Sequence, residues 1–292
     1  MLSLSSSYWE AHLGTLQKEL MSSLQTKGIW LHKQTTYAQN KNKRYINKLL
    51  YSVSEDAHET QRFQQVSESG CLFQIDLMNG LSTGLFLDQR NNRLRLPQLL
   101  PPSSRVLNLF AYTCSFSVIA AKMRPDCITT NVDISSHSLQ TGRNNFMVNG
   151  LMNANNDNHK FIVADAMEYS QLKENQNCFD LVICDPPTLF NRQRVIGNNV
   201  NSKGKAGITV SASRNFDEIA AAAACAVKPL GYLALFCNCH SLRKKKWLGM
   251  VNVGLSKTGR KYMEVEQLQA SYDFFEDPLE PDLKGVVYQF LD

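Results

Sequence analysis

No stretch of the 292-residue sequence approaches the roughly 18 uninterrupted apolar residues that a membrane-spanning helix needs. Residues 1–7 lack a basic segment followed by an apolar core, so a secretory signal is not expected. The eight cysteines form no Cys-x-x-Cys pair, and the close pair Cys237 and Cys239 lacks the second half of a zinc site. We therefore expect no membrane partner and no bound metal, and a reducing, cytoplasmic setting.

Hydrophobic residues make up 43% of the sequence and charged residues 20%, a balance that permits a packed core and excludes disorder over most of the chain. The formal net charge of +5 permits an anionic partner without identifying one. At this length we expect one large domain with a smaller domain attached.

From about residue 103 onward, short apolar runs alternate with stretches of helical pattern. Strands are predicted at 105–110, 127–132, 161–163, 179–184 and 232–236, and helices at 115–123, 135–149 and 216–227. The strands are apolar without alternation, as expected for strands covered on both faces, so the sequence predicts an α/β fold with a doubly wound, mostly parallel sheet. Pro229 and Gly231 are expected to close the last of these helices. Runs at 262–268 and 286–291 predict a terminal antiparallel pair.

The first hundred residues show a different order of predicted helices and strands. A helix is predicted at 8–24, where leucines recur at helical spacing, and short strands are predicted at 29–37, 63–66 and 71–77. We predict a small N-terminal α+β domain at 1–98 and a larger domain at 99–292. The stretch 192–213 is rich in Asn, Gly, Ser, Lys and Arg and predicts a long mobile loop.

Acidic residues close several of the predicted strands or stand beside their ends, namely Asp133, Asp165, Asp180 and Asp185. In an open parallel sheet, ligands bind beyond the carboxyl ends of the strands. Asp133 lies roughly 20 residues past the first turn, the spacing at which dinucleotide-binding folds place an acid that binds ribose. The alternative is a solvated strand end that caps the helix predicted from Ser135.

The turns that follow the strands narrow the choice of ligand. The turn at 110–115 contains no glycine, so the phosphate-cradling loop of NAD- and ATP-binding folds is absent, and a nucleoside cofactor without phosphates is left open. Asp185-Pro186-Pro187 follows the strand at 179–184 directly. Two prolines hold the backbone in a rigid, extended turn, which would present the Asp185 carboxylate to a planar substrate. An ordinary turn is the alternative.

Five segments occur in order along the chain: GLFLDQRNNR at 84–93, VLNLFAYTCSFSV at 106–118, TTNVDISS with NNFMVNGL within 129–151, VADAMEY at 163–169 and FDLVICDPPTLFNRQR at 179–194. Together they resemble the class I S-adenosylmethionine-dependent methyltransferases that modify large-subunit ribosomal RNA. The resemblance covers about residues 30 to 292. It implies a Rossmann-like seven-stranded sheet, S-adenosylmethionine as cofactor and ribosomal RNA as partner, and it leaves a homodimer open.

The resemblance also implies which residues bind the cofactor. Around its methionine part it places Asn108, Phe110, Ala111, Tyr112, Thr113 and Ser115. Asp133 would hold the ribose and Ile134 would pack on the adenine. Asp165 and Ala166 would read the amino edge of the adenine.

Two further segments would complete the implied site. The FLDQR run would cover the cofactor with Asp88, Gln89 and Arg90. The corner at 185–187 would face the methyl group and the incoming base, with Asp185 also touching the cofactor. The implied catalytic residues are Asp185, Pro186, Pro187 and Asn238.

One position departs from the family's pattern, since the family normally has glycine where this chain has Cys114. A side chain at this position is expected to crowd the cofactor or to force a different backbone angle. A methyltransferase fold that binds RNA without catalysis is therefore an alternative function.

Two branches of the family resemble the chain, one that methylates guanine at N7 and one that methylates cytosine at C5. Guanine N7 carries a lone pair and loses no proton, whereas cytosine C5 attacks only after a Cys thiolate has added to C6. Two residues after Phe236, where the cytosine branch has its nucleophilic cysteine, this chain has Asn238. This favours guanine N7 of 23S rRNA and leaves Cys237 or Cys239 as nucleophile in the cytosine alternative. Methylation of a protein or small molecule is a third hypothesis.

Cations in two clusters would contact the RNA at the cofactor edge. They are Arg192, Arg194, Lys203 and Lys205 after the D-P-P turn, and Arg243, Lys244 and Lys245 after the strand at 232–236. Both clusters would bind phosphates around a base splayed out of the RNA. A solvated charged face is the alternative reading.

Overall fold

The computed structural model describes residues 2–4, 11–24, 28–36, 43–52, 62–77, 82–152, 158–192, 208–277 and 279–292. The chain divides into two compact units, unit 1 being Met1–Val66 with Gln74–Leu85 and unit 2 being Ser67–Phe73 with Phe86–Asp292. Residues 86–98, which the sequence assigns to the small domain, fall in unit 2, where Leu96 is fully buried in the core. Two separately folding domains divided at residue 98 stay a prediction.

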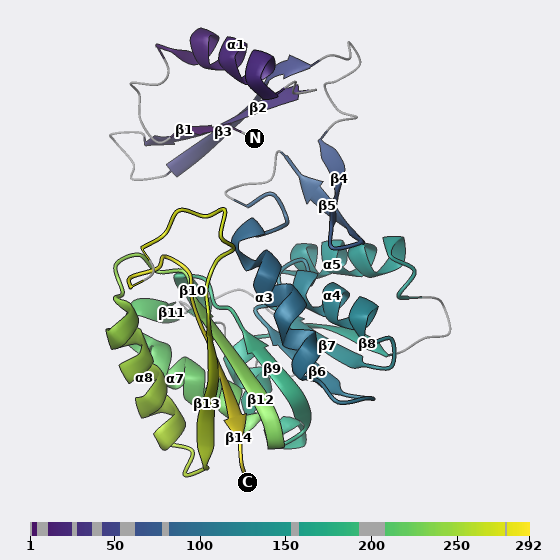
Figure 1. Ribbon diagram of the computed structural model, residues 1–292, viewed down its shortest axis with the longest axis vertical. Coiled ribbons are helices and arrows are strands. Elements are labelled where there is room, and N and C mark those ends of the chain that lie inside the picture. The colour runs from purple at the N-terminus through teal and green to yellow at the C-terminus, as the bar shows by residue number, and fades with distance from the viewer. Residues whose placement is uncertain are drawn as a thin grey trace. The chain divides into compact units, whose positions relative to one another are not determined.

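Unit 1 contains a helix and a three-stranded sheet (Figure 1). Its elements are β1 (Leu2–Leu4), α1 (Leu13–Leu24), β2 (Gly28–Thr36) and β3 (Lys43–Ser52). The strand β1 runs parallel to β2, and β2 runs antiparallel to β3. The sequence pattern missed β3 because basic and polar residues interrupt its apolar positions.

A two-stranded sheet of β4 (Phe63–Glu68) and β5 (Cys71–Asp76) follows, and the division between the units passes through it. Its turn consists of Ser69 and Gly70, both with positive φ (53° and 76°). Left-handed backbone at the two central residues is typical of two-residue hairpin turns, because it matches the twist of the strands.

Unit 2 is built on a seven-stranded sheet (Figure 1). Its strands are β6 (Arg105–Leu109), β7 (Ile128–Asp133), β8 (His159–Val163), β9 (Phe179–Cys184), β12 (Val227–Cys237), β13 (Tyr262–Leu268) and β14 (Lys284–Phe290). They lie in the order β13-β14-β12-β9-β6-β7-β8. All neighbours from β12 to β8 are parallel, and β14 is antiparallel to both β12 and β13. The predicted α/β fold, its mostly parallel sheet and its terminal antiparallel pair are confirmed.

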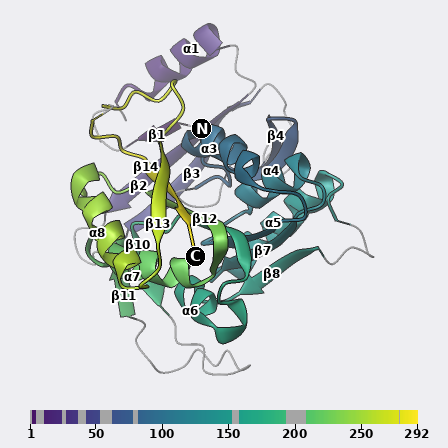
Figure 2. The same cartoon turned by 60° about the horizontal axis from the view of Figure 1, so that its bottom comes forward.

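Helices cover both faces of this sheet (Figure 2). In chain order they are η2 (Leu87–Gln89), α3 (Arg90–Arg95), η3 (Leu96–Leu99), α4 (Ser115–Met123), α5 (Ser136–Val148), α6 (Ala166–Gln171), η4 (Lys173–Asn175), α7 (Ala212–Cys225) and α8 (Lys244–Ser256). None of the helices in the described ranges is long and apolar enough to cross a membrane.

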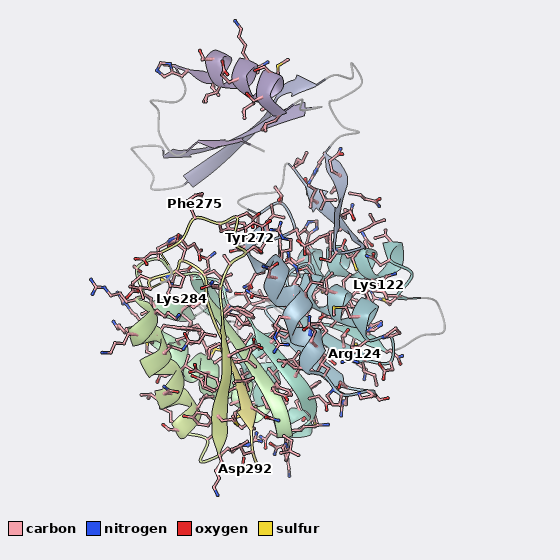
Figure 3. All side chains as sticks on the ribbon, in the orientation of Figure 1. Lys122, Arg124, Tyr272, Phe275, Lys284 and Asp292 are labelled. Carbon is pink, nitrogen blue, oxygen red and sulfur yellow. The ribbon has the colours of Figure 1, made fainter. Side chains whose placement is uncertain are left out.

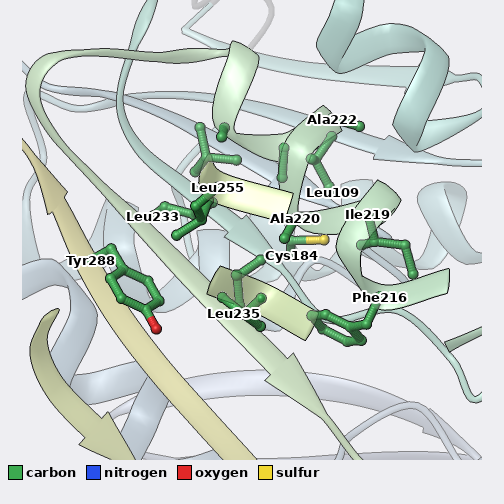
Figure 4. Close-up of a cluster of buried hydrophobic side chains, with 14 of the residues drawn as sticks. Leu109, Cys184, Phe216, Ile219, Ala220, Ala222, Leu233, Leu235, Leu255 and Tyr288 are labelled. Carbon is green, nitrogen blue, oxygen red and sulfur yellow. The ribbon is translucent and has the colours of Figure 1, made fainter. Parts of the chain in front are cut away.

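Two hydrophobic cores lie on the two faces of the sheet, and alternate residues of the central strands β9 and β12 belong to different cores. In β9, Val182 and Cys184 pack with α7 and α8, whereas Leu181 and Ile183 pack with the core that includes Phe116. Figure 4 shows the first core, where α7 contributes buried side chains beside β9 and β12. Each fully buried Leu or Phe stabilises the fold by ~1.5–3 kcal/mol. Because both cores pack against the strands of the sheet, they also fix the positions of the strand ends.

Two predictions of element boundaries were wrong. Pro229 and Gly231 do not close α7, which ends at Cys225; both lie in β12. An added Cβ at Gly231 would come within 2.9–3.1 Å of three backbone carbonyl oxygens, so glycine is needed where β12 approaches β9. At the ends of the predicted loop at 192–213, Arg192 is the last residue of β10 (Leu189–Arg192), residues 208–211 form the antiparallel strand β11 (Ile208–Ser211) and α7 begins at Ala212, whereas residues 193–207 lie outside the described residues.

Candidate functional site

The carboxyl ends of the five parallel strands meet at one edge of the sheet, which is where an open α/β sheet binds its ligands. Asp133 ends β7, Asp185 follows β9 and Asn238 follows β12 at this edge. Asp180 does not belong to it, because it is the second residue of β9 and pairs at the opposite edge with Lys228 and the Arg105 amide. The structure therefore places Asp133, Asp185 and Asn238 at one edge of the sheet, whereas Asp180 lies at the opposite edge.

The loop between β6 and α4 turns sharply without glycine. Phe110, Tyr112 and Cys114 all have positive φ, at 57°, 48° and 61°. Left-handed backbone at a residue with a Cβ costs ~1–2 kcal/mol, so the surrounding contacts must hold this loop. The Ala111 amide donates to Val132 O at 2.9 Å and the Cys114 amide to Ala111 O at 2.8 Å, which fixes the loop against the end of β7.

Asp133 is the main side-chain partner of this loop. Its Oδ2 accepts a hydrogen bond from Tyr112 N and its Oδ1 accepts one from Ser135 N, both at 2.8 Å. Burial raises the pKa of Asp133, and these backbone donors oppose the rise. Asp133 is not the helix cap, because Ser135 is the N-cap of α5 and accepts from Ser138 N through its own hydroxyl. Each carboxylate oxygen has a second lone pair that can accept from a ligand.

The Cys114 thiol packs against α5 and lies 3.8 Å from Tyr112 O, to which it can donate. An added Cβ at Gly142 of α5 would lie only 2.4 Å from Cys114 Sγ, so the thiol occupies the space that a side chain at Gly142 would need. Burial raises the pKa of this fully buried thiol well above its usual range, and Asp133 adds to the rise. The missing side chain of Gly142 accommodates the thiol, and the expectation that Cys114 crowds the cofactor stays a prediction.

The Asp185 corner is connected to η2 and α3. Gln89 Nε2 donates to Asp185 Oδ2 at 3.0 Å, and Asn92 Nδ2 donates to Gln89 Oε1 at 2.7 Å. Burial raises the pKa of Asp185 to about 7, the Asp88 carboxylate adds to the rise, and Gln89 and Arg93 oppose it. Asp185 is thus a carboxyl group that changes its charge near neutral pH.

A buried ion pair lies next to this corner and was missed by the sequence analysis. Arg93 donates from Nε and Nη2 to the two oxygens of Glu68, each at 2.8 Å, and its side chain is fully buried. Its Nη1 has no hydrogen-bond partner among the described residues, and neither has Asp88 Oδ1, which is also buried. The signal in the sequence was the second arginine of GLFLDQRNNR, three residues after Arg90.

The other predicted cofactor residues lie along the same edge or just behind it. Asn108 is buried and donates to Ser117 Oγ at 3.0 Å, and Thr113 O accepts from the buried Asn145. Asp165 caps α6 by accepting from Met167 N and Glu168 N. The remaining residues are Phe110, Ala111, Tyr112 and Ser115 in the loop, Ile134 with 45% of its surface exposed, and buried Ala166.

The predicted cationic clusters are only partly described. Arg194, Lys203 and Lys205 lie outside the described residues, and of Arg192 only its place in β10 is described. Arg243 and Lys245 are exposed at the start of α8, and the Lys244 amide donates to Glu280.

The cysteines after β12 are buried, whereas Asn238 between them is exposed. Burial raises the pKa of Cys237 to about 12. Asn238 O accepts a hydrogen bond from Thr188 Oγ1 at 3.1 Å, which places it beside the D-P-P turn. Within the described ranges, no group of three or more His, Cys, Asp or Glu side chains could hold a metal ion.

A seven-stranded sheet of this order, with its site at the carboxyl ends of the parallel strands, is typical of class I methyltransferases. Residues 9–202 match the family of S-adenosylmethionine-dependent methyltransferases, so the chain belongs to that family and uses S-adenosylmethionine as its cofactor. A candidate methyltransferase crystallised with SAH has the same fold, with a TM-score of 0.78 at 22% identity over 98% of this chain and 68% of that one.

Two curated relatives match half of the chain. The ribosomal RNA large subunit methyltransferase K/L of Psychrobacter cryohalolentis is 37% identical over 147 residues, and that of Colwellia psychrerythraea is 41% identical over 144 residues. These matches cover 50% and 48% of this chain but only 18% and 19% of the relatives. The matching part of the chain therefore spans about a fifth of the length of these relatives.

The packing of Cys114 against Gly142 predicts a compensating pair. Gly142→Ala should destabilise the parent protein by ~1–3 kcal/mol, because the new methyl group overlaps the thiol. In a Cys114→Gly background the same change should cost clearly less, since both Cys114 side-chain atoms are gone and Thr113 C at 3.3 Å is the tight contact left. Urea unfolding of the four proteins measures this coupling. Gly249→Ala in α8, which meets no atom within 4 Å, is the control and should not destabilise; an equal cost of Gly142→Ala in both backgrounds would contradict the packing.

The raised pKa of Asp185 predicts a pH-dependent stability. Below about pH 4 the carboxyl is protonated in both folded and unfolded protein. As pH rises from about 4 to about 7, the carboxyl ionises in the unfolded protein while burial and Asp88 keep it protonated in the folded protein, so the folded protein loses stability over this range, and above about 7 the loss is complete. Asp185→Asn should therefore stabilise the protein at pH 8 by on the order of 2–4 kcal/mol and have little effect at pH 4, as measured by urea unfolding. An equal gain at both pH values would show that the carboxylate is not the cause.

Proposed function

We propose that the chain transfers the methyl group of S-adenosylmethionine to RNA, at guanine N7 of the large-subunit ribosomal RNA. The observation that carries the proposal is the meeting of the Asp133 loop and the Asp185-Pro186-Pro187 corner at one edge of the sheet. The relatives that match this region at 37% and 41% identity are ribosomal RNA methyltransferases, which supports an RNA acceptor.

The unpartnered polar atoms near Asp185 fit the amino-acid tail of the cofactor. This tail carries an ammonium and a carboxylate, so it needs acceptors and a cation side by side. Asp88 Oδ1 and the Asp185 carboxylate would accept from the ammonium, and Arg93 Nη1 would donate to the carboxylate. A buried ionic group without a partner is unfavourable, so such a ligand would satisfy groups that the described residues leave unpaired.

The rest of the cofactor would lie along the sheet edge. Asp133 would accept from the ribose hydroxyls with its remaining lone pairs. Ile134, with 45% of its surface exposed, would pack on the adenine, and Asp165 with Ala166 would lie at its amino edge. The backbone of the loop at 110–115 would follow the methionine part, with Asn108 behind it. The bound cofactor supplies an electrophilic methyl group on its sulfonium.

The acceptor base would meet the corner formed by Pro186, Pro187 and Asn238. Methyl transfer is an in-line displacement, so catalysis consists largely of holding the base at the right distance and angle. The two prolines make a rigid turn after β9, and the exposed Asn238 carboxamide beside it can bond the base. Guanine N7 needs no general base, so the proposed reaction requires no proton transfer from the carboxyl groups at this edge.

The two alternatives find less support. Methylation of cytosine C5 needs a thiolate, but Cys237 and Cys239 are buried, and the pKa of Cys237 is raised to about 12. The non-catalytic alternative depends on Cys114 blocking the cofactor, and its thiol packs against Gly142 instead.

Incubation with tritiated S-adenosylmethionine and large-subunit ribosomal RNA should label the RNA, and nucleoside analysis should identify the product as 7-methylguanosine. Cys237→Ser and Cys239→Ser should keep this activity within a few-fold, because neither thiol takes part. Labelled 5-methylcytidine, or loss of transfer in either cysteine variant, would favour the cytosine alternative. Absence of any label in RNA would reject the proposed acceptor.

Asp133→Ala should weaken the binding of S-adenosylmethionine by roughly 10–100-fold, because it removes bonds to both ribose hydroxyls, each worth about 1 kcal/mol, and releases the Tyr112 amide. Titration calorimetry measures this affinity. The matched control is Asp126→Ala, which removes an exposed carboxylate that also accepts a backbone amide, that of Ser103. Unchanged cofactor affinity in Asp133→Ala, or an equal loss in both variants, would contradict the assigned site.

A further inference from the structure

The segment between β13 and β14 exposes aromatic side chains at the edge that carries the site. We refer to residues 269–283 as the rim loop. Tyr272 and Phe275 in this loop are 95% and 107% exposed relative to a free side chain, and Figure 3 shows both at the outer side of the loop. The rim loop leads into Lys284, which pairs with Cys237 at the end of β12, so it lies at the carboxyl edge of the parallel strands.

The rim loop is held in one conformation by its own acidic residues. Two of them pair with side chains: Asp273 with Arg90 at 2.7 Å and Asp282 with His240 at 2.5 Å. The other three accept hydrogen bonds from backbone amides: Glu276 from Leu283 (3.2 Å), Asp277 from Leu279 (2.9 Å) and Glu280 from Lys244 (3.0 Å). Buried Lys284 adds bonds from Nζ to Pro281 O at 2.9 Å and Asp282 O at 2.8 Å. All five carboxylates of the loop therefore have a partner within the described part of the chain, and the rings of Tyr272 and Phe275 are exposed.

Two of these contacts connect the rim loop to the site. Arg90, which binds Asp273, is adjacent in sequence to Gln89, the hydrogen-bond donor to Asp185. Lys244, whose amide binds Glu280, begins α8 beside the exposed cations Arg243 and Lys245. The rim loop thus contacts the start of α8, where Arg243 and Lys245 are exposed, and also Arg90, the neighbour of the residue that bonds Asp185.

We propose that Tyr272 and Phe275 form a stacking surface for unpaired RNA bases next to the methylated nucleotide, with Arg243 and Lys245 binding the adjoining phosphates. The inference rests on the proposed function and extends it by naming single-stranded RNA as the form of the acceptor. Aromatic faces bind any base by stacking, and neighbouring cations bind the backbone, which is the chemistry of single-strand recognition. A base drawn out of a helix leaves unstacked neighbours that need such a surface.

The test compares Tyr272→Ala/Phe275→Ala with Tyr272→Phe/Phe275→Tyr, which keeps both rings. Met263→Ala is the control, because Met263 is 50% exposed on β13 but lies near the strand's other end. Binding of an unstructured RNA oligonucleotide is measured at several salt concentrations, together with cofactor affinity, thermal stability and the KM for ribosomal RNA.

The alanine pair should weaken RNA binding by roughly 10–100-fold and raise the KM for RNA, with kcat, cofactor affinity and stability unchanged. The slope of log affinity against log salt should stay the same in the alanine pair, whereas Lys245→Ala should reduce it by about one. The ring-preserving pair and Met263→Ala should behave like the parent.

The experiment distinguishes failure of the stacking surface from failure of the proposed function. A parent protein that methylates RNA, with an alanine pair of unchanged KM and RNA affinity, overturns the stacking surface and leaves the proposed function intact. A parent that transfers no methyl group to RNA overturns both. An alanine pair that loses stability or cofactor affinity assigns the rings to the fold or the cofactor site and overturns the inference.

Discussion

The candidate site depends on the Asp133 carboxylate, which connects two chain segments that contain no glycine. Its hydrogen bonds to Tyr112 N and Ser135 N connect the loop after β6 with the start of α5. Three residues of that loop keep left-handed backbone although each has a side chain, at a cost of ~1–2 kcal/mol apiece. Because the contacts of the folded protein meet this cost, the loop is already shaped before a ligand arrives, and binding need not order it.

The charges beside this loop form a network that the described residues complete only in part. Glu68 occupies two nitrogens of Arg93 and leaves the third, and the half-buried Asp88 carboxylate raises the pKa of the half-buried Asp185. Such an arrangement destabilises the fold unless a ligand of mixed charge binds to it. A network of this kind lowers the stability of the free protein but is already arranged to bind a ligand. The zwitterionic tail of S-adenosylmethionine has the complementary charges.

The acceptor side of the site has a different character. The groups that would meet the acceptor, namely Pro186, Pro187, the exposed Asn238 carboxamide and the exposed rings of Tyr272 and Phe275, are uncharged. This division is expected where one ligand is recognised by charge and the other, a flat base, by shape and stacking. The cofactor side and the acceptor side are connected, since the neighbours Gln89 and Arg90 contact Asp185 and Asp273 respectively.

By itself the sequence determined the seven strands of the large sheet in their chain order, because buried strands such as 179–184 are contiguous apolar runs that need no tertiary information to be recognised. It also placed Asp133 and Asp185 at one edge, since the carboxyl ends of parallel strands must meet. Only the tertiary structure decided that the Cys114 thiol packs into Gly142, that Gln89 bonds a residue 96 positions away, and that Arg90 anchors a loop 183 positions away. Side-chain direction and charge pairing arise from the packing of elements distant in the chain, and no local pattern of residues encodes them.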